Sequence, residues 1–80
     1  MYHAYILRSL KTGRLYKGSC EDLNRRVAKH NAGHVRSTKP YRPWSLVHHE
    51  EFATRSQAFR REQYWKTAKG ARELQSILNQ

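Results

Sequence analysis

One short segment of the sequence places an arginine and a histidine at a spacing that suits phosphate chemistry. Arg26 and His30 stand four residues apart, and residues at this separation lie on the same side of a helix. Leu23 and Val27 share their stripe, so the helix can pack on a core while the two polar groups lie at its edge. A guanidinium can stabilise charge on a reacting phosphate, and an imidazole can move a proton. The alternative is a surface cation beside a hydrogen-bonded, partly buried histidine.

Two tyrosines in neighbouring strands are candidates for proton transfer. Tyr5 and Tyr16 could accept a proton or position a water molecule, but a tyrosine has a pKa of about 10 and needs nearby positive charge to act as a base. A metal ion, Arg26 or Lys17 could supply that charge and lower the pKa. The alternative is a pair of half-buried packing residues, which is the commoner use of tyrosine in strands.

A single acid stands on the inward side of a predicted helix. Ala58, Glu62 and Trp65 are spaced i, i+4 and i+7, so a carboxylate shares the face that packs on the core. One carboxylate can hold Mg²⁺ when water and phosphate oxygens complete the shell. The alternative is an ion pair with Arg61 or Lys66, because structural ion pairs outnumber metal sites. Glu62 is therefore both a metal-ligand candidate and an ion-pair candidate.

The charge of the chain indicates a polyanionic partner. Sixteen Lys and Arg residues against six Asp and Glu give a formal net charge of +10 in 80 residues, which predicts nucleic acid as the partner. The length suits one domain over residues 1–80. No apolar run approaches the roughly 18 residues of a spanning helix, so no membrane is expected. One cysteine excludes an internal disulfide and fits a cytoplasmic protein, which could associate with the nucleoid. A nucleic-acid-binding protein without catalysis would carry the same charge.

Hydrophobic patterning predicts the elements that would hold these residues. Strands are expected over residues 2–7, 15–18 and 44–52, with the first buried on both faces. Asp22 can cap a helix that ends at Gly33, and Gly18 is expected to turn the chain tightly into that helix. A capping box at Thr54 opens a second helix that runs to about residue 68 and stops at Gly70. Residues 71–78 form a last short helix that covers the core.

A loop with two prolines and three cations separates the first helix from the third strand. Residues 34–43 read HVRSTKPYRP, without the periodicity of a helix or strand. Such a loop could contact phosphates, and its alternative is a solvated basic loop. With three further cations elsewhere in the chain, the residues expected to contact nucleic acid are Lys17, Arg25, Lys29, Arg36, Lys39 and Arg42.

Taken together, these motifs resemble the GIY-YIG nuclease family along nearly the whole chain. Residues 3–5 read His-Ala-Tyr where the first motif would stand, and residues 16–18 read Tyr-Lys-Gly where the second would stand. The stretch DLNRRVAKH over residues 22–30 is similar to the helix that follows the second motif. Residues 37–47 and 60–62 resemble the small stand-alone bacterial members. His3, Ala4 and Lys17 depart from the family's usual residues, but none of them is assigned to the reaction.

The resemblance implies an α+β fold, with a small three-stranded antiparallel sheet flanked by about three helices. It also implies a metal-dependent cut of a nucleic-acid strand. Carried over residue by residue, Tyr5 is the general base and Tyr16 its helper. Arg26 stabilises the transition state, with His30 near it, and Glu62 binds the single Mg²⁺ or Mn²⁺.

The nature of the substrate follows from the resemblance and from the size of the chain. We expect an endonuclease acting on DNA rather than RNA, without strict sequence specificity, since so small a surface has little room to read bases. Selectivity for nicks, flaps or branches is compatible with the sequence, as is a role in DNA repair. Two alternatives stay open: a binding module that keeps the nuclease fold without the reaction, and a nuclease for which a protein partner supplies targeting.

Overall fold

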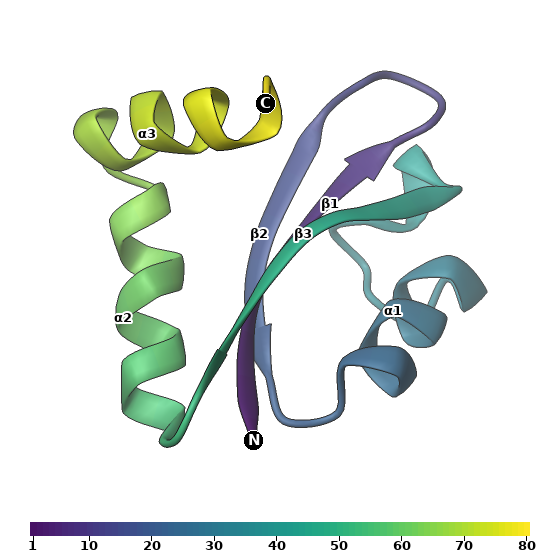
Figure 1. Ribbon diagram of the computed structural model, residues 1–80. Coiled ribbons are helices and arrows are strands. Elements are labelled where there is room, and N and C mark those ends of the chain that lie inside the picture. The colour runs from purple at the N-terminus through teal and green to yellow at the C-terminus, as the bar shows by residue number, and fades with distance from the viewer.

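Strand β1 (Tyr2–Ser9) is the centre of the fold. It lies between β2 (Leu15–Cys20) and β3 (Trp44–Phe52), and both pairs are antiparallel. The computed structural model describes all 80 residues. Figure 1 shows the three-stranded sheet with its helices, which are α1 (Leu23–Ala32), the short 3₁₀ helix η1 (Lys39–Tyr41), α2 (Arg55–Trp65) and α3 (Ala68–Leu78). This is the predicted α+β architecture.

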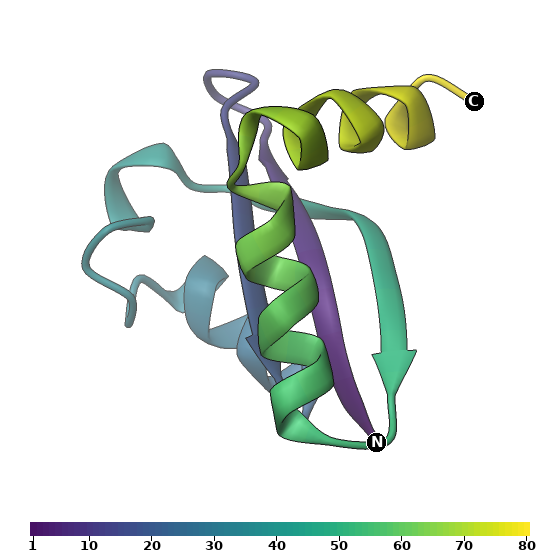
Figure 2. The same cartoon turned by 90° about the vertical axis from the view of Figure 1, so that its left-hand side faces the viewer.

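Helices cover both faces of the sheet, which explains the unbroken apolar run of β1. Helix α1 lies on one face and α2 on the other, while α3 crosses one end of the sheet (Figures 1 and 2). Successive side chains of a strand point to opposite faces. Ala4 and Ile6 pack with Trp65 of α2 on one side, whereas Tyr5 and Leu7 pack with Leu23, Trp44 and their neighbours on the other. The prediction that this strand is buried on both faces is confirmed.

The end of the second helix differs from the sequence prediction. Helix α2 ends at Trp65, and Gly70 lies inside α3, where the Thr67 side chain caps the first turn. A Cβ at Gly70 would lie 1.8 Å from the carbonyl oxygen of Tyr64. This glycine therefore allows α3 to pass closely over the last turn of α2, and it does not stop a helix. The predicted capping box at Thr54 and Gln57 is present.

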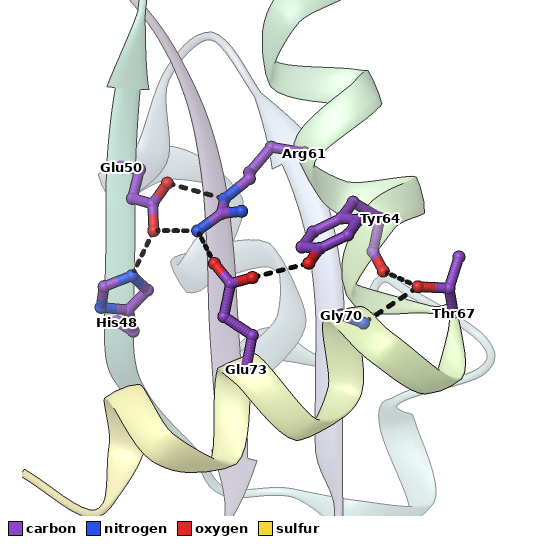
Figure 3. Close-up of polar contacts among 7 residues, drawn as sticks. All are labelled: His48, Glu50, Arg61, Tyr64, Thr67, Gly70 and Glu73. Carbon is purple, nitrogen blue, oxygen red and sulfur yellow. Dashed lines mark hydrogen bonds and ion pairs between the residues drawn. The ribbon is translucent and has the colours of Figure 1, made fainter.

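A cluster of charged side chains fastens α2 and α3 to β3 (Figure 3). The Arg61 guanidinium donates to both carboxylate oxygens of Glu50, from Nε at 2.9 Å and from Nη2 at 3.3 Å. It also donates to Glu73 of α3 at 3.3 Å, and Tyr64 donates to the same carboxylate at 2.6 Å. His48 lies 2.8 Å from Glu50. These contacts link three elements, so they contribute to stability and lie apart from the α1 face.

We expect acidification to weaken this cluster through Glu50. Burial opposes ionisation of the Glu50 carboxylate, but Arg61 and His48 outweigh it and hold its pKa below the ordinary value. Stabilisation by a carboxylate with a lowered pKa is complete above the unfolded-state pKa and is lost as pH falls through the folded-state pKa. Between pH 7 and pH 3 the wild-type protein should therefore lose about 1 kcal/mol more stability than Glu50→Gln.

Thermal unfolding followed by circular dichroism at the two pH values measures this difference. Glu51→Gln is the matched control, because the next carboxylate of β3 is exposed and takes no part in the cluster. Equal pH dependence in wild type and Glu50→Gln would contradict the prediction.

No helix of the fold has the length and apolar character needed to cross a membrane.

Candidate active site

Four of the five predicted catalytic residues lie together on the α1 face of the sheet. The Tyr5 hydroxyl oxygen is 3.0 Å from Nε2 of His30. The Tyr16 ring lies 4.7 Å from the His30 ring and 6.2 Å from the Tyr5 ring, measured between centroids. The Arg26 guanidinium stands beside both tyrosines, which raise its pKa. The structure therefore groups two hydroxyls, one imidazole and one guanidinium at a single place.

Helix α1 presents Arg26 and His30 because both of its ends are fixed. The Asp22 side chain accepts a hydrogen bond from the backbone N–H of Arg25 at 3.1 Å, as an N-cap should. Gly33 ends the helix in the left-handed conformation, with a φ of 82°. Leu23 packs on the sheet and His30 is fully buried beneath the helix. The predicted cap, stop and inward stripe are all confirmed.

Gly18 supports the site in a way that differs from its predicted role. It lies within β2, directly opposite Tyr5 in the register, and does not turn the chain into α1. A Cβ at this position would lie 2.5 Å from both Cζ and the hydroxyl oxygen of Tyr5. Because Gly18 has no side chain, the end of the Tyr5 ring fits into the space beside it.

We predict that Gly18→Ala displaces the Tyr5 ring from His30. Because the ring is buried and close-packed, the extra methyl should cost about 1–3 kcal/mol of stability. If Tyr5 takes part in cleavage, as the sequence resemblance implies, a hydroxyl moved by about 1 Å should lower cleavage roughly 10²-fold. Thermal unfolding and a cleavage assay measure the two effects.

Gly13→Asn is the control for the Gly18→Ala measurement. Gly13 lies in the β1–β2 turn with open space around it, and asparagine tolerates its left-handed backbone. Wild-type cleavage by Gly18→Ala would show that the close contact does not position Tyr5.

Burial is the largest influence on the pKa values of Tyr5 and His30. Desolvation raises the pKa of Tyr5 far above its ordinary value, and the neighbouring Arg26 lowers it only in part. In the free protein the positive charge of Arg26 therefore does not lower this pKa overall. Burial, and then the charge of Arg26, lower the pKa of His30 to about 4. At neutral pH the pair consists of a neutral phenol and a neutral imidazole.

Arg26 lines an open cavity beside Tyr5 and His30, and one of its donors has no partner. Nε of Arg26 is buried and has no hydrogen-bond partner. Arg26 lines a shallow cavity of about 320 Å³ with Cys20, Asp22, Arg25 and Lys29. Burial raises the pKa of the Cys20 thiol, which opposes a nucleophilic thiolate. The Arg26 guanidinium and two neighbouring cations, Arg25 and Lys29, can bind a phosphate in this cavity.

Glu62 lies on the other face of the sheet from the tyrosine cluster. The Ser19 hydroxyl donates to its Oε1 at 2.8 Å, and the Lys66 ammonium donates to its Oε2 at 2.7 Å. Ser19 and Gly18 are consecutive residues of the edge strand β2, so Glu62 and the hydroxyl of Tyr5 approach the same edge from opposite sides. The ion pair considered as an alternative thus exists with Lys66, whereas Arg61 pairs elsewhere.

Five of the six cations predicted to contact nucleic acid lie on α1 or in the loop that follows it. Arg25 and Lys29 project from α1, and Lys39 and Arg42 contact the end of that helix around Gly33. Arg36 is exposed in the loop between them. A second open cavity of about 560 Å³ is lined by Lys11, Asn31, Lys39, Pro40, Arg42 and Pro43.

Lys17 lies apart from these cations. Its side chain points to the α2 face, where Nζ donates to the carbonyl oxygen of Trp65 at 3.0 Å. A cation at this position stabilises the carboxyl end of α2. It does not lie beside Tyr5, so it cannot supply the positive charge that the sequence had suggested.

Comparison with known proteins identifies the family of this chain. The model of the GIY-YIG catalytic domain matches residues 1–75. The chain belongs to the GIY-YIG family. The resemblance inferred from the two tyrosine motifs and the α1 segment is thereby confirmed, and this GIY-YIG domain has a nuclease fold, which implies contact with nucleic acid.

Relatives of this GIY-YIG domain span almost its whole length. A UPF0213 protein of Staphylococcus saprophyticus subsp. saprophyticus is 39% identical over 77 residues, covering 95% of this chain and 93% of the relative. A UPF0213 protein of Staphylococcus aureus strain Mu3 has the same identity and coverage. The solution NMR structure of a UPF0213 protein from Bacillus halodurans has a TM-score of 0.56 and 31% identity, covering 96% of this chain and 85% of that one. None of these names specifies a reaction.

Sequence reasoning missed several residues that contact the site of this GIY-YIG domain. Thr38 is buried and its hydroxyl oxygen lies 2.8 Å from Nδ1 of His30. Ser19 contacts Glu62, and Lys11 lines the larger basic cavity. Thr38 lies in a loop with no periodicity, so no local pattern indicates that it is buried. Ser19 could have been found, because it follows Gly18 in the second motif and must point to the opposite face.

Proposed function

We propose that this GIY-YIG domain is an endonuclease that hydrolyses phosphodiester bonds, with DNA preferred to RNA. The observation that carries the proposal is the buried contact between Tyr5 and His30 beside the unpaired Nε of Arg26. A proton-accepting pair and a guanidinium that can bind phosphate at one place are what phosphodiester hydrolysis requires. Phosphate contacts carry no sequence information, so we infer little sequence specificity and allow for selectivity by substrate shape.

The proposed reaction uses Tyr5 as a relay rather than as a tyrosinate. As a water oxygen bonds to phosphorus, a water proton passes to the Tyr5 oxygen while the Tyr5 proton passes to Nε2 of His30. The bond from phosphorus to the leaving oxygen breaks, and that oxygen takes a proton from solvent. Arg26 donates to the phosphate oxygens as negative charge grows on them. Tyr16, beside both rings, orients the attacking water.

His30 becomes a better proton acceptor once the substrate is bound. The charge of Arg26 is one of the two causes that lower the His30 pKa. A phosphate anion against Arg26 offsets that charge, so the imidazolium costs less free energy in the complex than in the free protein. Substrate binding thereby prepares the imidazole for the proton that it receives.

Glu62 is the residue proposed to hold Mg²⁺ or Mn²⁺. Its carboxylate and the Ser19 hydroxyl offer hard oxygen atoms of the kind that these ions prefer. No three His, Cys, Asp or Glu side chains are grouped so that they could hold a metal ion together. One carboxylate fits an ion that keeps several waters and binds together with a substrate phosphate. When bound, the ion would supply positive charge to the phosphate at the β2 edge.

The exposed cations around α1 are proposed to hold the nucleic-acid backbone. Arg25 and Lys29 border the cavity beside Arg26, and Lys39 and Arg42 continue the positive surface past Gly33 to Lys11. Helix α1 has ten residues and is thus about 15 Å long. These cations can therefore contact several phosphates of one strand, which orients the strand over the site.

Salt dependence of binding tests this surface. We expect Lys39→Gln and Arg42→Gln each to reduce the slope of log K against log salt by about 1, because each removes one phosphate contact. Lys69→Gln, which removes an exposed charge of α3, should leave the slope unchanged. Fluorescence anisotropy with a labelled duplex between low and moderate salt measures it. Equal slopes for all three variants would exclude a localised phosphate surface.

Cleavage by the purified chain tests the proposed activity. Labelled single-stranded, duplex, flap and branched DNA, and RNA, are incubated with Mg²⁺, Mn²⁺ or EDTA. Cutting of DNA that EDTA abolishes supports the proposal and identifies the preferred substrate shape.

Two other results would favour the alternatives. Salt-sensitive binding without cutting on every substrate would favour a binding module that keeps the fold. Cutting that occurs only in a purified complex would favour a protein partner that supplies targeting.

A further inference from the structure

A chain of hydrogen bonds continues from the tyrosine cluster into the loop that follows α1. Tyr5 contacts Nε2 of His30 at 3.0 Å, and Nδ1 of His30 contacts the hydroxyl oxygen of Thr38 at 2.8 Å. The Thr38 hydroxyl lies 3.2 Å from the carbonyl oxygen of Val35. Tyr5, His30 and Thr38 are each 1% exposed or less. In the free protein, solvent therefore has almost no access to these three side chains.

The two tautomers of neutral His30 differ in whether every donor in this series of hydrogen bonds has an acceptor. A hydroxyl and a neutral imidazole carry one proton each, and the Val35 carbonyl can only accept. With the imidazole proton on Nδ1, Tyr5 donates to Nε2, Nδ1–H donates to Thr38, and Thr38 donates to Val35. Every proton then has an acceptor.

The other tautomer leaves one buried donor without a partner. With the proton on Nε2, His30 donates to the Tyr5 oxygen and Thr38 donates to Nδ1. The Tyr5 proton then finds no acceptor, because the neighbouring Arg26 guanidinium is itself only a donor. A buried donor without an acceptor is rare and costs free energy. The contacts thus favour the proton on Nδ1.

We propose that Thr38 is a positioning residue that holds His30 with its proton on Nδ1, so that Nε2 faces Tyr5 as a proton acceptor. This inference deepens the proposed endonuclease function and, for its effect on cleavage, rests on it. An acceptor at Nδ1 fixes the ring and its tautomer, as the aspartate does in a serine-protease triad. Here the acceptor is a neutral hydroxyl, which orients His30 without adding a negative charge beside the phosphate.

The backbone of Thr38 is held independently of this hydroxyl. Its carbonyl oxygen accepts from the Trp44 indole N–H at 2.9 Å, and its backbone N–H donates to Val35 at 3.1 Å. Thr38→Val keeps both backbone contacts and the shape of the side chain, and it removes only the hydroxyl. Thr38→Ser keeps the hydroxyl and removes the methyl group. The two variants therefore separate hydrogen bonding from packing.

The tautomer is measured directly by long-range ¹H–¹⁵N correlation spectra of protein labelled at histidine nitrogens, with the His30 signals assigned from the His30→Gln spectrum. In wild type and Thr38→Ser we expect a protonated Nδ1 and an unprotonated Nε2. In Thr38→Val either tautomer leaves one buried donor unpaired, so we expect the preference for Nδ1 to be lost and a population protonated on Nε2 to appear. A wild-type His30 protonated on Nε2, or a Thr38→Val spectrum with unchanged His30 nitrogens, would overturn the proposal. The wild-type and Thr38→Ser spectra decide the matter even if Thr38→Val does not fold.

Cleavage of the best substrate gives the second readout. We expect Thr38→Val to lower kcat roughly 10²-fold with KM unchanged, and Thr38→Ser to restore most of it. Wild-type kcat in a Thr38→Val protein with the altered tautomer would overturn the link between Thr38 and catalysis. If wild type cuts no substrate while its His30 carries the proton on Nδ1, the proposed function fails and the tautomer assignment stands.

Discussion

Glu62→Gln is expected to bind nucleic acid as wild type does and to cut it about 10³-fold more slowly. The amide keeps the shape of the side chain and an oxygen that can accept from Ser19, which lies 2.8 Å from Glu62. It removes the negative charge that a divalent cation requires. Initial cleavage rates under single-turnover conditions, with affinity measured by anisotropy, separate the two effects. Cutting within threefold of wild type would exclude Glu62 as the metal ligand.

Lys66→Gln is the matched control for this variant. It breaks the 2.7 Å ion pair between Lys66 and Glu62 but leaves the carboxylate in place. If Glu62 serves only the ion pair, the two variants should lose similar stability and neither should lose cleavage. If Glu62 holds the metal ion, Lys66→Gln keeps cleavage and needs no more Mg²⁺ than wild type, because a competing cation has been removed.

Arg26→Lys is expected to lower kcat about 10²- to 10³-fold while KM changes little. Lysine keeps the positive charge but loses the planar fork of donors, including the buried Nε that has no partner in the free protein. A donor reserved for the transition state affects the chemical step more than ground-state binding. Steady-state kinetics on the preferred substrate separate kcat from KM.

Arg25→Lys is the control for Arg26→Lys on the same helix. Arg25 is exposed and faces the backbone of the nucleic acid in the proposed complex. The substitution keeps its charge, so kcat should stay within about twofold of wild type. Equal losses in the two variants would mean that Arg26 is one of several phosphate contacts and has no special role in the transition state.

Local sequence patterns were enough to predict the features that depend on neighbours within one or two turns of the chain. The separation of Arg26 and His30, the cap at Asp22 and the stop at Gly33 follow from helix geometry, which acts over about four residues. The inward position of Glu62 follows from the same periodicity. The two-sided burial of β1 follows from an apolar run that does not alternate. These features can be predicted locally because the hydrogen bonds and the buried face of a helix or strand are determined by residues within that element.

The pairing of these residues and the effects of their charges depend on the tertiary structure. Tyr5 and His30 are 25 residues apart and Ser19 and Glu62 are 43 apart, so no local pattern fixes either contact. From sequence alone, Gly18 could either form a turn or leave room for an aromatic ring. The strand register places it opposite Tyr5, so it leaves room for the tyrosine ring.

The direction of the Tyr5 pKa is the clearest example of this limit. Positive charge from Arg26 predicts a lower value, but desolvation is the larger effect, and its size depends on how completely α1 and the sheet cover the ring. Thr38 lies in the site for the same reason, because its side chain becomes buried only when it packs against Trp44 and His30. How completely a side chain is buried depends on the packing of the helices and loops on the sheet, so it cannot be predicted from a local sequence pattern.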